Sequence, residues 1–263
     1  MTVAEGITVY EHETPPCAIG LQWTERELQD AIEGGVAAIL FDDAGMSTME
    51  TIRTGLAETG FASDELQLAL NSSQEIEDWR VGEAIAEAYL VDHRDCEFPW
   101  PRSRDERSTR SSFTGADLVG FRTDECGNSL AFGEVKTSGQ DRYPPSVIYG
   151  SDGLKQQLEN LRDQTGIRDR LLTYLSYRAE STPWHARFQA ASVRYLRDKS
   201  DCHLYGFLVR DVLVDERDLR SLAQNFAQDS GTHPSIELLA LYLPAGSIEG
   251  IGRAVADRRR GAE

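Results

Sequence analysis

The chain has 263 residues with 44 acidic and 27 basic side chains, which gives a formal net charge of −17 at pH 7. This length is sufficient for a complete hydrophobic core, but the longest apolar stretch, residues 34–41, is far shorter than the roughly 20 residues of a transmembrane helix. The first residues show no basic segment followed by an apolar run, so we expect a cytoplasmic protein without a secretory signal. The four cysteines lack CxxC spacing, which argues against a zinc site, and no P-loop motif is present.

Residues 1–70 are expected to form an N-terminal α+β accessory lobe. Apolar and β-branched residues predict strands at 7–13 and 18–23, and helical periodicity predicts helices at 25–41 and 48–58. Asp42 and Asp43 fall at a helix end, where they are expected to solvate a turn. Nothing in this lobe indicates a reaction.

Residues 74–91 have the periodicity of a helix that packs on one side. Glu83 and Glu87 are one helical turn apart and therefore lie on one face. Gly82 would let this helix approach a sheet closely, at about 1 kcal/mol relative to alanine. Residues 99–114 then form a proline- and serine-rich stretch, in which Trp100 either anchors the loop or stacks on a base.

Two apolar runs at residues 116–122 and 129–137 flank a turn-forming cluster at 124–128 and predict a β-hairpin. If the turn is centred between Glu125 and Cys126, Asp117 lies opposite Glu134. Because side chains alternate along a strand, this face also carries Lys136 and four apolar residues, namely Val119, Phe121, Leu130 and Phe132. Two opposed carboxylates about 5 Å apart between β-carbons repel each other unless a cation or a proton lies between them.

A divalent ion would relieve this repulsion, and oxygen ligands favour Mg²⁺ or Mn²⁺. Lys136 is one of only three lysines in a chain that otherwise uses arginine. Arginine is a poor substitute for a compact ammonium beside a metal-bound water. The alternative interpretation is an exposed sheet face with a cross-strand ion pair, which explains the opposed carboxylates poorly.

The remaining sequence predicts a helical stretch from 152 to about 178, capped by Ser151, and a helix at 183–197. Nearly continuous apolar runs at 203–210 and 236–243 predict buried strands, and a helix at 215–228 connects them as a parallel pair. We therefore expect an α/β fold in which helices flank a central mixed β-sheet, with residues 71–263 as the core domain.

Asp117 followed after a hairpin by Glu134-Val135-Lys136 resembles the metal-binding motif of the PD-(D/E)xK nuclease superfamily, which has the restriction-endonuclease-like core. The resemblance implies that Asp117, Glu134 and the Val135 carbonyl bind metal, and that Lys136 orients or activates the attacking water. It also implies a glutamate from the preceding helix, for which Glu83 is preferred over Glu87, and a glutamine from the following helix. Gln157 is preferred there over Gln156. The superfamily's proline before the aspartate is replaced by Ala116.

This resemblance implies an Mg²⁺- or Mn²⁺-dependent nuclease that cleaves DNA, with RNA a less favoured substrate. The motif order and chain size are similar to the HamA family of Hachiman antiphage defence systems, whose nuclease works with a helicase. A restriction or repair endonuclease and a noncatalytic interaction module of the same fold remain alternatives.

The negative charge is unfavourable for binding DNA, because basic groups supply most of the affinity for phosphates. Three accounts remain open: a local basic groove, a partner that supplies the binding, or an acidic proteome in a salt-adapted host. A groove would use four arginines of the stretch 99–114, namely Arg102, Arg104, Arg107 and Arg110, although the same stretch could be a solvated loop.

Overall fold

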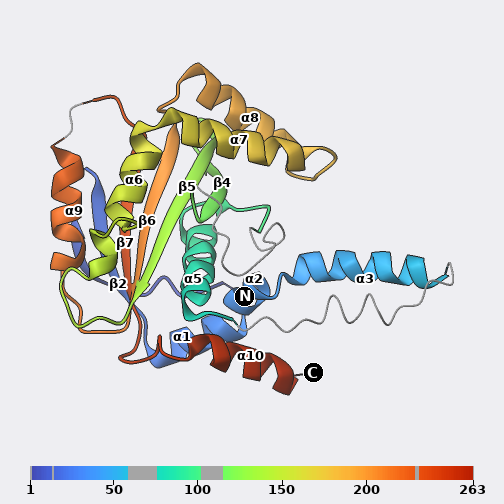
Figure 1. Ribbon diagram of the computed structural model, residues 1–263, viewed down its shortest axis with the longest axis horizontal. Coiled ribbons are helices and arrows are strands. Elements are labelled where there is room, and N and C mark those ends of the chain that lie inside the picture. Colours follow the sequence, from blue (N-terminus) through green and yellow to red (C-terminus); the bar gives the residue numbers. More distant parts are fainter. Residues whose placement is uncertain (1, 14, 59–75, 102–114, 229–230, 263) are drawn as a thin grey trace.

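The computed structural model describes residues 2–13, 15–58, 76–101, 115–228 and 231–262 (Figure 1). Its centre is a seven-stranded mixed sheet in the order β1-β2-β7-β6-β5-β4-β3. The strands span β1 Ile7–His12, β2 Cys17–Gln22, β3 Cys96–Glu97, β4 Leu118–Asp124, β5 Gly127–Ser138, β6 Cys202–Arg210 and β7 Ser235–Tyr242. Helices pack on both faces of this sheet, which confirms the predicted α/β class.

The N-terminal strands continue the central sheet. Strand β2 pairs in parallel with β7, and β1 pairs with the outer side of β2. The boundary expected between residues 70 and 71 lies outside the described residues. The predicted N-terminal lobe, however, contributes strands β1 and β2 to the sheet that also contains the hairpin strands β4 and β5.

The predicted helix 25–41 is two helices, α1 Glu25–Glu33 and α2 Gly35–Leu40, because the backbone of Gly34 leaves the helical region. Thr24 and Glu27 form a capping box that starts α1. Helix α3, Asp43–Glu58, begins earlier than the expected residue 48 and extends away from the sheet in Figure 1.

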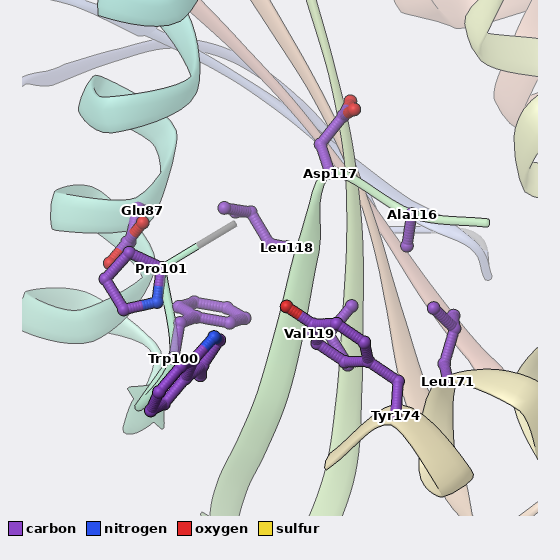
Figure 2. Close-up of a pocket in the computed structure, with 10 residues that line it drawn as sticks. Glu87, Trp100, Pro101, Ala116, Asp117, Leu118, Val119, Leu171 and Tyr174 are labelled. Atoms are coloured by element: carbon purple, nitrogen blue, oxygen red, sulfur yellow. The ribbon is translucent and has the colours of Figure 1, made fainter. Parts of the chain in front are cut away.

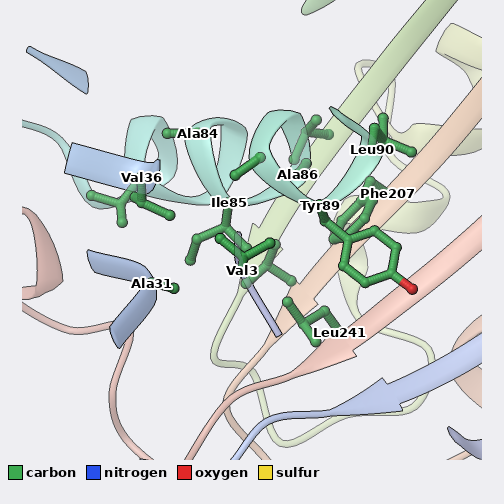
Figure 3. Packing of buried hydrophobic residues seen from close by; sticks show 14 of the residues in the cluster. Val3, Ala31, Val36, Ala84, Ile85, Ala86, Tyr89, Leu90, Phe207 and Leu241 are labelled. Carbon is green, nitrogen blue, oxygen red and sulfur yellow. The ribbon is translucent and has the colours of Figure 1, made fainter. Parts of the chain in front are cut away.

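One face of the sheet is covered by α1, α2, α5 (Asp78–His93) and α10 (Ile251–Ala262). Figure 3 shows Tyr89 of α5 beside Phe207 of β6, and the centres of these two rings are 5.7 Å apart. The approach to β5 is close, since a β-carbon on Gly82 would lie 1.9 Å from Thr137 Oγ1. A glycine is therefore needed where this helix crosses the strand.

The opposite face is covered by α6 (Leu154–Asp163), α7 (Thr165–Ala179), α8 (His185–Arg197) and α9 (Arg217–Ala227). A short 3₁₀ turn, Ser146–Ile148, precedes α6. The helical stretch expected from 152 is two helices separated at Gln164, and its N-cap is Gly153 rather than the predicted Ser151. Strands β6 and β7 are parallel and adjacent, as predicted.

A buried ion pair secures the segment that follows β5. Arg210 at the end of β6 is fully buried and lies 3.1 Å from Asp218 of α9. Its guanidinium also donates hydrogen bonds to the carbonyl oxygens of Ser138, Gln140 and Arg142. The end of β5, two residues beyond Lys136, is thereby fixed to the centre of the sheet.

Within the described ranges, none of the helices combines the length and the apolar character needed to cross a membrane.

Candidate metal centre on the hairpin

The β4–β5 hairpin has the register that the sequence predicts. Leu118 pairs with Gly133 and Val119 with Phe132, so the next pair outward is Asp117 with Glu134. The Asp117 N–H extends the ladder by donating to the Gly133 carbonyl at 2.9 Å. The opposition of these two carboxylates is therefore confirmed.

Two interactions orient the groups of this site. The Val135 N–H donates to Asp117 Oδ2 at 2.8 Å, which ties the aspartate to the facing strand. Lys136 Nζ lies 3.4 Å from Glu134 Oε1, at the long end of hydrogen-bonding distance. The second Glu134 oxygen, Oε2, is buried without a hydrogen-bond partner among the described residues.

Burial determines the charge state of Glu134. Its side chain is only 4% exposed, whereas that of Lys136 is 20% exposed. Desolvation raises the pKa of Glu134 well above its ordinary value, the nearby Asp117 carboxylate raises it further, and Lys136 opposes the shift. A buried carboxyl with one unsatisfied oxygen beside a second carboxylate is a group that a bound cation would stabilise.

A glycine in the strand next to Glu134 allows α6 to pack closely on the sheet. Gly206 of β6 is the register partner of Glu134, and a β-carbon there would lie 2.7 Å from Leu158 of α6. Helix α6 therefore lies close over this part of the sheet, on the face that carries Glu134. Gln157 is half-buried next to Leu158 in the chain, whereas Gln156 is exposed and bonds Asn160.

The two glutamates of α5 occupy different surroundings. Glu83 is half-buried and follows Gly82, which packs on Thr137 on the α5 face of the sheet, opposite the face that carries Glu134 and Lys136. Glu87 instead lines a pocket with Asp117 and a group of apolar side chains. In Figure 2 the Asp117 carboxylate lies at the start of β4 and points away from this pocket, while the Glu87 carboxyl lies beside Pro101. Burial, and then Asp42, raises the pKa of Glu87 to about 8.

Some predicted residues are not part of the geometry just described. Arg102, Arg104, Arg107 and Arg110 lie outside the described residues. The Val135 group that contacts Asp117 is its N–H, and its side chain is buried on the α5 face. In the portion of the chain that the structure describes, no three histidine, cysteine or acidic side chains are grouped to hold a metal. The described site is thus a carboxylate pair with an adjacent lysine.

Sequence reasoning did not identify the residues of α7 that approach the hairpin. Leu171 and Tyr174 line the same pocket as Asp117, and Arg178 lies 3.7 Å from the centre of the Tyr174 ring. Helical periodicity predicts only that Leu171 and Tyr174 lie on one side of a helix. Their approach to β4 depends on a long-range packing that no local pattern indicates.

No protein-family model and no curated protein matches this chain. The resemblance to metal-dependent nucleases therefore rests on the motif and on the geometry of the hairpin.

Proposed function

We propose that this chain is a divalent-metal-dependent nuclease that cleaves phosphodiester bonds of DNA in the cytoplasm. The observation that carries the proposal is the meeting of Asp117 and Glu134 across the hairpin, with Lys136 next to Glu134 on the same face. Opposed carboxylates on a buried face destabilise a fold. A reaction that needs a bound cation would explain why the protein retains both carboxylates.

The residues present fit a hard divalent ion. Asp117 and Glu134 would hold Mg²⁺ or Mn²⁺, and the unsatisfied Glu134 Oε2 provides an oxygen for it. The Val135 carbonyl and Glu83 are proposed as further ligands. Such an ion, when bound, would neutralise charge on the phosphate and lower the pKa of a water molecule.

The chain's own groups would position the reactants. The Val135 N–H holds Asp117 in one orientation. Lys136 would donate a hydrogen bond to the attacking water and stabilise charge that develops on the phosphate oxygens. Gln157, half-buried on α6, is proposed to contact the scissile phosphate or the metal site.

We further propose that the sheet and its helices form a restriction-endonuclease-like core and that the chain is a HamA-like effector of an antiphage defence system. The net charge of −17 supports a helicase partner that brings the DNA, because an acidic chain binds phosphates weakly. A restriction or repair endonuclease would use the same site.

A noncatalytic interaction module is the second candidate. It is favoured by one observation, which is that the described residues bring together only two carboxylates where a metal cluster usually needs more ligands. Such a module would keep the fold and bind a helicase or another nuclease, and Glu134 would remain protonated.

Cleavage assays with matched variants test the proposal. Supercoiled, linear and single-stranded DNA would be incubated with the wild-type chain and Mg²⁺, alone and with a candidate helicase. We expect Glu134→Gln and Lys136→Arg each to reduce the rate by on the order of 10²- to 10³-fold. The controls Glu125→Gln, in the exposed hairpin turn, and Lys155→Arg, in the ion pair with Glu159 on α6, should retain activity. A wild-type chain that cleaves nothing in any combination and binds no metal would support the module.

A further inference from the structure

A pocket enriched in aromatic side chains opens beside the carboxylate pair (Figure 2). It lies between α5, the segment after β3, the start of β4 and α7. We call it the aromatic pocket and define it by the residues that line it, namely Glu87, Phe98, Trp100, Pro101, Ala116, Asp117, Leu118, Val119, Leu171 and Tyr174. Asp117 thus belongs both to the candidate metal centre and to the wall of this pocket.

The walls suit a flat ring with a polar edge. Figure 2 shows the rings of Trp100 and Tyr174 entering the pocket from different elements. Aromatic faces of this kind accept nucleobases of any sequence, because every base has a π-face. Among the described residues that line the pocket, two carry ionisable carboxyl groups, Glu87 and Asp117.

The side chain of Arg178 places a positive charge beside the rings of Trp100 and Tyr174. The Arg178 guanidinium lies 3.7 Å from the centre of the Tyr174 ring and 5.8 Å from the centre of the Trp100 ring. Stacking of this kind orients the rings and brings a cation to a strongly acidic molecule. A strand whose base enters the pocket would therefore have a cation near its phosphates.

We propose that the aromatic pocket binds one unstacked nucleobase of the strand whose phosphate lies at the metal centre. This inference rests on the proposed function and specifies its substrate class. Bases in an intact duplex are stacked and paired, so occupancy of the pocket requires single-stranded or locally opened DNA. Trp100 and Tyr174 stack on the base, and the Glu87 carboxyl bonds its polar edge. A neutral carboxyl, which the raised pKa of Glu87 favours, both donates and accepts.

Binding measured in EDTA separates this inference from catalysis. Fluorescence anisotropy at low ionic strength would compare a labelled single-stranded oligonucleotide, the same strand with one abasic site scanned along it, and the matching duplex. The wild-type chain should prefer the single strand, and the abasic site should weaken binding on the order of 10-fold at one position. Equal affinity for all three oligonucleotides, or no measurable binding of the single strand, overturns the proposal.

Substitutions on α7 provide a matched pair. Tyr174→Ala should weaken single-strand binding on the order of 10- to 100-fold. Tyr177→Ala, three residues along the same helix with 81% of the residue exposed, should leave it unchanged. Trp100→Phe retains a ring and should lose less than Trp100→Ala. In the Trp100→Ala variant, the abasic site should cause no additional loss of affinity for the single strand. Equal losses in Tyr174→Ala and Tyr177→Ala contradict the assignment.

The two proposals fail in different ways. If the wild-type chain cleaves duplex and single strand equally and Tyr174→Ala cleaves like wild type, the nuclease proposal stands and the aromatic pocket has no role in binding. If no DNA is cleaved but single strands bind with the abasic dependence just described, the pocket proposal stands and the nuclease proposal fails.

Discussion

Replacing Glu134 with glutamine should make the folded protein more stable when divalent cations are absent. The carboxyl is buried opposite Asp117 and has one oxygen without a partner. An unsatisfied buried polar group costs about 1–3 kcal/mol, and an amide can donate to Asp117 where a carboxylate repels it. The lost ion pair with Lys136, at 3.4 Å, offsets part of this gain.

The effect should depend on pH in a defined direction. Because the folded-state pKa of Glu134 is raised above its ordinary value of 4.5, the folded protein binds this proton more tightly than the unfolded chain. The stability linked to that proton is present in full below pH 4.5 and is lost as the pH rises through the folded-state pKa. The advantage of Glu134→Gln should therefore grow as the pH rises.

Thermal unfolding in EDTA at several pH values measures this difference. In a chain of this size about 1 kcal/mol corresponds to roughly 2–4 °C, so we expect the variant to melt a few degrees higher at pH 8. Glu125→Gln changes the net charge equally at an exposed position and should show no such trend. Mg²⁺ at 100 times its dissociation constant should stabilise the wild type by about 2.7 kcal/mol and leave the variant unchanged. A variant less stable than wild type at pH 8 would refute the reasoning.

Three further changes test the fold around the site. Arg210→Met should destabilise the protein by about 3–5 kcal/mol in urea unfolding, because it leaves Asp218 charged and buried, and adding Asp218→Leu should recover most of the loss. Gly82→Ala should lower both the melting temperature and the cleavage rate through its clash with Thr137, and Gly82→Ala combined with Thr137→Ala should restore them. If the double variant is no better than the single one, the contact is not the cause. Glu87→Gln should remove a loss of stability that the wild type shows between pH 4.5 and about 8, since burial raises the pKa of Glu87, and identical pH profiles would contradict this.

The hairpin was predictable because its determinants are local. The turn residues and the alternation of apolar side chains specify the register, and the register brings Asp117 opposite Glu134. The parallel strands β6 and β7 were recognisable as short apolar runs, since both of their faces are covered by helices. The break at Gly34 and the separation of α6 from α7 at Gln164 were missed, because helix ends depend on individual backbone conformations.

The site beyond the hairpin depended on contacts between distant segments. Tyr174 and Trp100 come close to Asp117 only in the packed fold. The pKa of Glu134 is raised mainly because the surrounding residues bury its carboxyl group. The sequence by itself determined the carboxylate pair and its lysine, since their spacing is set by strand alternation across a short turn. The tertiary structure alone decided burial, charge state and the pocket, because these arise from long-range packing of helices on the sheet.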